Sequence, residues 1–172
     1  GDVTANAGSG GVFVTASNGA NFTATATGAG DIQLTSTTGT LNIAGATSTG
    51  TGNITLNAVA GTITQGAALS GNVLTTNSVG GTTLNSANAV SGFSATNTGG
   101  GEVSLTNTVA LDIAAAGITQ NVGNLNITNT GAITQTGTIS NNGVTSVATF
   151  AAGAGNNITL GGANDFNQVS IA

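Results

Sequence analysis

The residues of this chain that could do chemistry are few, because its only ionisable side chains are five acids. The acids are Asp2, Asp31, Glu102, Asp112 and Asp165. Two carboxylates about 5–9.5 Å apart could hydrolyse a glycosidic bond, and several carboxylates together could bind calcium. His, Cys, Lys and Tyr are absent, so the usual general bases, activated nucleophiles and soft metal ligands are missing.

A pair of carboxylates at glycosidase spacing is not expected. Asp31 and Glu102 occupy equivalent positions in two copies of a long repeat. If three solenoid turns of ~4.8 Å separate them, their distance is about 15 Å, which is too long for either glycosidase mechanism. Asp112 lies between the apolar Leu111 and Ile113 and is expected to point outward. The sequence therefore predicts no catalytic residue and no enzymatic activity.

One segment has the composition of a calcium site. Gly28–Ile32 resembles part of the Gly-Gly-x-Gly-x-Asp-x-Leu repeat of calcium-binding β-rolls. Its spacing differs by one position, and Asn53, Glu102 and Asn124 occupy the equivalent positions elsewhere. Calcium takes about six to eight oxygen ligands, several of them carboxylates. We expect Asp31 to hydrogen-bond a turn instead, as Asp commonly does, and we predict no metal or other cofactor.

The charge of the chain argues against two classes of partner. Lys, Arg and His are absent and the net charge is −5, so no cation can neutralise nucleic-acid phosphates or anionic lipids. No apolar run approaches the ~20 residues that span a bilayer. We expect neither nucleic-acid binding nor membrane insertion. A mean hydropathy of +0.28 with no Pro favours a folded domain over a disordered chain.

Short segments in which apolar and small polar residues alternate fill the sequence, which is typical of β-strands with one buried face. Such segments are Asp31–Leu34, Leu41–Ile43, Asn53–Leu56, Glu102–Leu105, Leu111–Ile113 and Asn157–Leu160. The residues expected inside are Ile32, Leu34, Ile54, Leu56, Val103, Leu105, Leu125 and Ile127. Those expected to face solvent are Gln33, Thr55, Ser104 and Asn126. No helical periodicity is present, so we predict an all-β fold.

The segments recur at fixed distances. The steps from Asp31 to Asn53 and from Glu102 to Asn124 are equal in length. At a longer period, Leu41 matches Leu111 and Ile63-Thr64-Gln65 matches Ile133-Thr134-Gln135 at one common distance, while Ala87-Asn88 matches Ala163-Asn164 at a slightly longer one. Such self-similarity indicates a solenoid. We expect one solenoid over residues 1–172, an excerpt of a longer repetitive chain, with copies at about 1–30 (partial), 31–101 and 102–172.

The geometry of parallel strands favours one kind of solenoid. A repeat of about 70 residues would form about three turns, whose strands stack in parallel ~4.8 Å apart. The right-handed parallel β-helix is favoured because parallel crossovers almost always take that hand. Gly and Asn suit left-handed backbone at sharp corners. Because Pro is absent, every strand residue keeps the backbone N–H group that sheet hydrogen bonds require.

Several strings resemble the repeats of filamentous-haemagglutinin-like adhesins, which are very large bacterial surface exoproteins. These strings are Thr27–Thr35, Gly131–Gly137, Ala152–Leu160 and Ala163–Phe166. The resemblance covers nearly the whole chain. It implies a right-handed β-helical shaft outside the cell, with no functional residue in the shaft itself. The alternative function is a subunit or repeat of a homopolymeric extracellular fibre or sheath.

The remaining candidates are weaker. Four Asn-x-Thr sequons could accept glycans, and the five Phe are expected in the core. The sequons begin at Asn21, Asn53, Asn126 and Asn157, and the Phe are at 13, 22, 93, 150 and 166. Thr23, Thr25 and Thr27 allow an ice-binding ladder locally, but Thr35, Thr55, Thr106 and Thr128 supply only one Thr per turn. For partners, we expect end-to-end self-association or continuation in a longer chain.

Overall fold

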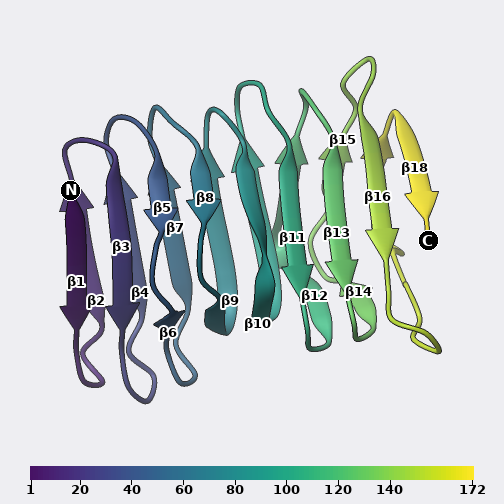
Figure 1. Cartoon of the computed structure of the whole chain (residues 1–172). Coiled ribbons are helices and arrows are strands. Elements are labelled where there is room, and N and C mark those ends of the chain that lie inside the picture. Colours follow the sequence, from purple (N-terminus) through teal and green to yellow (C-terminus); the bar gives the residue numbers. More distant parts are fainter.

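A computed structural model describes residues 1–172 and contains eighteen β-strands and no helix, hence none that could cross a membrane. The strands are β1 (Asp2–Asn6), β2 (Val12–Ala16), β3 (Ala20–Thr25), β4 (Ile32–Ser36), β5 (Leu41–Ile43), β6 (Thr47–Ser48), β7 (Ile54–Ala58), β8 (Ile63–Gln65), β9 (Leu69–Ser78), β10 (Thr82–Asn97), β11 (Val103–Asn107), β12 (Leu111–Gln120), β13 (Leu125–Asn129), β14 (Ile133–Gln135), β15 (Ile139–Asn141), β16 (Val147–Ala151), β17 (Asp165–Phe166) and β18 (Gln168–Ile171). They stack in two layers, with the termini at opposite ends (Figure 1).

Two parallel sheets face each other across the core. Sheet I contains β1, β3, β5, β6, β8, the first parts of β9 and β10, β11, β13, β16 and β18. Sheet II contains β2, β4, β7, the later parts of β9 and β10, β12, β14, β15 and β17. Because β9 and β10 bend from one sheet into the other, all strands share one hydrogen-bonded network. The chain is a right-handed parallel β-helix of about eight turns, as predicted.

The core is formed by the alternate residues of both sheets. The eight residues that were expected inside, from Ile32 to Ile127, are each at most 1% exposed. Phe22, Phe93 and Phe150 are also fully buried. One cluster of apolar side chains therefore runs along the axis, and burying it is the main force that holds the turns together.

The long repeat spans three and a half turns, half a turn more than expected. Leu41, Ile63, Thr82 and Val103 follow one another in register on sheet I, which makes three turns. Leu111, the equivalent of Leu41 in the next copy, comes after Val103 and lies in β12 of sheet II. Equivalent strands of successive copies therefore lie on opposite sheets.

Glycine alone supplies the left-handed backbone at the corners. Eight Gly residues have positive φ and no other residue does, so the expectation that Asn would share this role is wrong. At Gly101, with φ of 87°, a Cβ atom would lie 2.1 Å from the carbonyl oxygen of Gly80. Close stacking of the turns therefore requires glycine there. The Asn side chains instead hydrogen-bond between turns.

Two side chains differ from expectation. Ser104 lies on the outer face of sheet I as expected but is only 4% exposed, because its small side chain stands in register between Thr83 and Asn126. Phe13 was expected in the core but is 64% exposed. Val12 is buried and successive strand residues point to opposite faces, which places Phe13 on the outer face of β2.

Candidate functional site

Each of the five carboxylates accepts a hydrogen bond from a neighbouring turn. Asp2 accepts from Nδ2 of Asn21 at 2.8 Å and Asp31 from the backbone N–H of Asn53 at 2.7 Å. The other donors are Nδ2 of Asn126 to Glu102 (3.3 Å), Oγ1 of Thr134 to Asp112 (3.0 Å) and Nδ2 of Asn142 to Asp165 (2.6 Å). The acids thus connect adjacent turns of the solenoid.

The carboxylates are also scattered over the surface. Asp31 precedes β4 of sheet II, and Glu102 precedes β11 of sheet I. The expectation that these two share one face, three turns apart, is therefore wrong, because the repeat spans a half-integral number of turns. Asp112 is half-buried beside the core residues Leu111 and Ile113, with its side chain outward as expected. No three acidic side chains gather in one place.

A pair of side-chain amides marks the same point in both copies of the repeat. Gln65 and Asn88 hydrogen-bond each other in both directions, and Asn88 Oδ1 also accepts from the N–H of Leu69 at 2.9 Å. Gln135 and Asn164 do the same, and Asn164 accepts from the N–H of Ile139 at 2.9 Å. We call each such pair an amide clamp. Each clamp bridges the gap between two consecutive strands. The gaps are residues 66–68, between β8 and β9 in sheet I, and residues 136–138, between β14 and β15 in sheet II.

Further buried amides stand at the corners. Asn107 donates to Asn129 Oδ1 at 3.1 Å and to the carbonyl oxygens of Val90 and Val109. Asn97 donates to Gln120 Oε1 at 2.8 Å on the adjacent turn. These amides satisfy backbone groups that the bends leave unpaired, which a buried turn requires.

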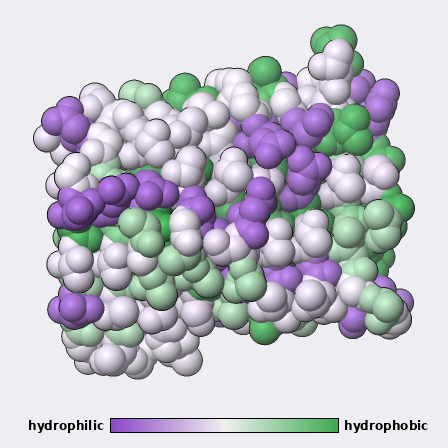
Figure 2. Space-filling view, in the orientation of Figure 1, coloured by the Kyte–Doolittle hydropathy of each residue, from purple (hydrophilic) through white to green (hydrophobic).

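A row of polar side chains runs along the outer face of sheet I, one for each turn. Its members are Asp2, Asn21, Asn42, Thr64, Thr83, Ser104, Asn126, Thr149 and Ser170. Asn42 donates to Asn21 at 2.9 Å and accepts from Thr64 at 3.0 Å. Figure 2, which faces this sheet, shows a hydrophilic band that starts at the N-terminal end. The row is a ladder of side chains between stacked turns.

The outermost strands have open edges. β1 pairs only with β3, and β18 pairs only with β16. Val169 and Ile171 of β18 stand in register with the buried Ala148 and Phe150. They are nevertheless 52% and 59% exposed. The C-terminal end of this chain therefore presents core positions that a further turn would cover.

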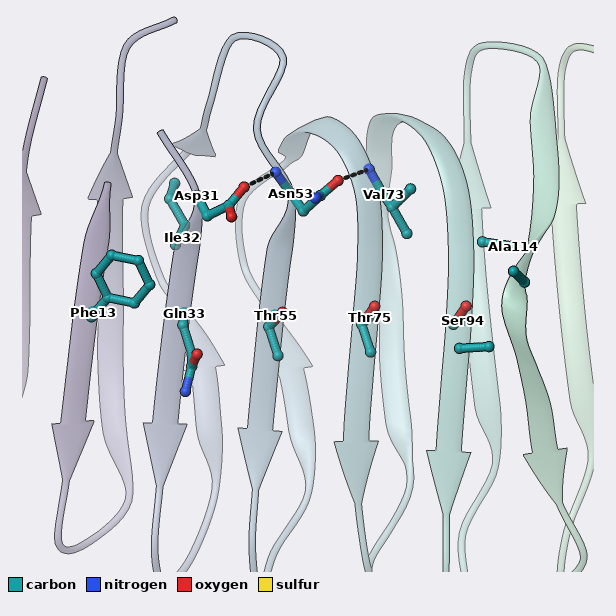
Figure 3. Close-up of a pocket in the computed structure, with 12 residues that line it drawn as sticks. Phe13, Asp31, Ile32, Gln33, Asn53, Thr55, Val73, Thr75, Ser94 and Ala114 are labelled. Carbon is teal, nitrogen blue, oxygen red and sulfur yellow. Dashed lines mark hydrogen bonds between the residues drawn. The ribbon is translucent and has the colours of Figure 1, made fainter. Parts of the chain in front are cut away.

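The outer face of sheet II is hollowed. A surface hollow of about 390 Å³ lies over β2, β4, β7, β9, β10 and β12. Figure 3 shows Phe13 at one end and Ala114 at the other. Between them lie side chains of Gln33, Thr55 and Thr75. The sequence did not indicate this hollow, because it depends on which turn stacks beside which.

The other residues singled out from the sequence do not form one site. Thr35 and Thr55 lie in sheet II, whereas Thr106 and Thr128 lie in sheet I, so these threonines form no single ladder. Of the sequon asparagines, Asn21, Asn53 and Asn126 take part in hydrogen bonds between turns. Asn157 is exposed.

Comparison with known proteins gives one match. Residues 100–172 match a family described as "Repeats of unknown function (DUF5649)". The matched segment nearly coincides with the repeat copy 102–172 and covers less than half of the chain. The searches of curated proteins and of solved structures found no match.

Proposed function

We propose that the chain is a shaft segment of a secreted bacterial surface protein of the adhesin type, without catalysis of its own. The observation that carries this proposal is the uniformity of the solenoid, in which about eight turns stack in parallel register from β1 to β18. A shaft requires this property, because each turn is then held by the turns on both sides.

The contacts between turns suit a segment that must resist tension along its axis. The backbone hydrogen bonds of parallel sheets run along the solenoid axis, so tension on the shaft is shared by all bonds between two turns. The amide clamps add side-chain bonds in the same direction, for example from Gln65 to Asn88. The polar row on sheet I adds more, as from Asn42 to Asn21.

The placement of the acids supports a structural role over a catalytic one. A catalytic carboxylate normally lies in a cleft beside a second functional group. Here each carboxylate faces a donor on a neighbouring turn, and Asp31, which borders the hollow of sheet II, has no other ionisable residue beside it there. Similarity to a family of repeats over residues 100–172 agrees with a repetitive shaft, as does the resemblance of the strings to adhesin repeats.

A fibre subunit is the second candidate. An open edge accepts a strand from an identical molecule as readily as the next turn of the same chain. A net charge of only −5 over 172 residues provides little repulsion between copies. The length of the whole protein separates the candidates: thousands of residues favour a shaft, and a few hundred favour a fibre subunit.

The proposal is tested by immunoelectron microscopy of intact producing cells, using antibodies raised against the chain. A shaft gives label along separate rods on the cell surface, whereas a homopolymer gives label along continuous filaments. Label confined to the cell interior would contradict both candidates. A pre-immune serum and cells that lack the protein provide the controls.

A further inference from the structure

The hollow on sheet II has a floor of polar side chains. Gln33, Thr55, Thr75 and Ser94 stand in register on β4, β7, β9 and β10. The hydroxyl groups of Thr55 and Thr75 make no hydrogen bond within the protein, and Figure 3 draws none from their side chains to the other residues of the hollow. Over these four strands and the adjacent β2, the floor is about 19 Å long at ~4.8 Å per strand. The floor thus offers hydroxyl and amide groups at regular intervals.

One group of the floor is unsatisfied within the protein. Ser94 is 2% exposed, lines the hollow, and its Oγ atom has no hydrogen-bond partner. A buried hydroxyl without a partner destabilises the fold and needs an explanation. The Oγ atom itself is enclosed, so the floor groups within reach of a ligand are those of Gln33, Thr55 and Thr75.

The two ends of the hollow rise above the floor. At one end the ring of Phe13, on β2 beside Gln33, is 64% exposed. At the other end, Phe93 of β10 pairs with Ile113 of β12, and Ala95 pairs with Ile118. Residues 114–117 therefore stand opposite a single residue of β10 and bulge out of β12. Ala114, Ala115 and Ala116 of this bulge line the hollow. The hollow is therefore a trough with an aromatic wall and an aliphatic wall.

The bulge is fixed by its glycine. Gly117 has φ of 74°, and a Cβ atom there would lie 2.3 Å from the carbonyl oxygen of Thr138 on the next turn. No other residue fits this position without displacing the next turn. The aliphatic wall is accordingly a built feature of the sheet.

Along one side of the trough the rim carries polar groups. Oδ1 of Asp31 accepts from the N–H of Asn53, and Oδ1 of Asn53 accepts from the N–H of Val73 at 3.2 Å (Figure 3). These bonds hold both side chains in place. The second carboxylate oxygen of Asp31 and the amino group of Asn53 are left to face a ligand.

We propose that this trough binds a neutral saccharide. Sugar rings have an apolar C–H face that packs on an aromatic ring such as Phe13, and hydroxyl groups that both donate and accept hydrogen bonds. Gln33, Asn53 and the floor hydroxyls match the second property. The chain has no cation and a net charge of −5, so an anionic ligand is disfavoured. The inference does not depend on the shaft function.

The test starts with an array of immobilised neutral oligosaccharides, namely linear glucans, mannans, galactans, xylans and chitin fragments. We expect binding of at least one class, with a Kd of about 1 mM or tighter. Nuclear magnetic resonance titration with that oligosaccharide should shift backbone signals of β4, β7, β9 and β10 in the wild-type chain. Binding of none, or shifts confined to sheet I, would overturn the proposal.

Variants then assign the contacts. Phe13→Ala removes an exposed ring, so the fold should persist, and the affinity should fall roughly tenfold. Val144→Ala, at a side chain 92% exposed on the loop before β16, is the matched control and should leave the affinity unchanged. Unaltered affinity in Phe13→Ala would refute the site. Stronger binding of heparin or of spermine than of every neutral sugar would also refute it.

Discussion

The two amide clamps allow a direct comparison, because one is buried and the other is half open to solvent. Asn88 is 0% exposed, and besides Gln65 it bonds the N–H of Leu69 (2.9 Å) and the carbonyl oxygens of Leu84 (3.0 Å) and Thr106 (2.9 Å). Asn88→Ala removes all three of these bonds and leaves the buried N–H of Leu69 without the Asn88 acceptor. Since an unsatisfied buried group costs about 1–3 kcal/mol and each further bond contributes about 1 kcal/mol, we expect a loss of at least about 3 kcal/mol of unfolding free energy.

The equivalent substitution in the other clamp should cost less. Asn164 is half-buried and bonds only Gln135 and the N–H of Ile139. Water can replace these bonds, so Asn164→Ala should cost about 1 kcal/mol. The two variants lose the same atoms, so the difference between them measures burial together with the two additional bonds that Asn88 makes to backbone carbonyl groups.

Urea unfolding followed by circular dichroism gives both free energies. A second probe, the exchange of the Leu69 amide hydrogen, checks that the transition is cooperative, because solenoids can unfold in parts. In Asn88→Ala this amide should exchange much faster than in wild type. Equal losses of stability in the two variants would show that the clamps contribute through something other than buried hydrogen bonds.

Three further perturbations test the core and the ends. Ile54→Asp should cost at least about 4 kcal/mol, because it opens a cavity and buries a charge that no cation can meet; a loss under about 1 kcal/mol would contradict the packing. Thr76→Val should raise the unfolding free energy by about 1 kcal/mol, because Oγ1 of the fully buried Thr76 has no partner; a loss would reveal an unrecognised bond. Analytical ultracentrifugation of the isolated chain should show concentration-dependent association through β1 and β18, and a monomer at every concentration would argue against open ends.

The sequence was sufficient for the fold because the solenoid is determined by local alternation. Ile32 and Leu34 alternate with polar residues, and the step from Ile32 to Ile54 corresponds to one turn. The longer period was recognised, but its relation to the turns was not. Whether a copy fills a whole number of turns depends on the total length of the loops at its corners. Here the total adds half a turn, so Leu41 lies on sheet I and its equivalent Leu111 lies on sheet II.

The surface features needed the structure. Phe13 is apolar, and this alone predicts a core position. Its neighbour Val12 is buried, however, and adjacent residues of a strand point to opposite faces, so Phe13 faces outward. The repeated Gln65 and Asn88 were visible in the sequence as matches to Gln135 and Asn164. Their pairing was not, because the two partners of each clamp lie on adjacent turns, far apart in the sequence. The trough likewise combines residues of six strands.

The length of the native protein under the electron microscope tests the shaft most directly. With turns of about 21 residues and a rise of ~4.8 Å per turn, an uninterrupted solenoid gains about 0.23 Å per residue. The shaft account predicts straight rods whose repetitive region has this length, so that a thousand residues span roughly 230 Å. Compact particles, or beads whose spacing does not follow this rise, would contradict the account.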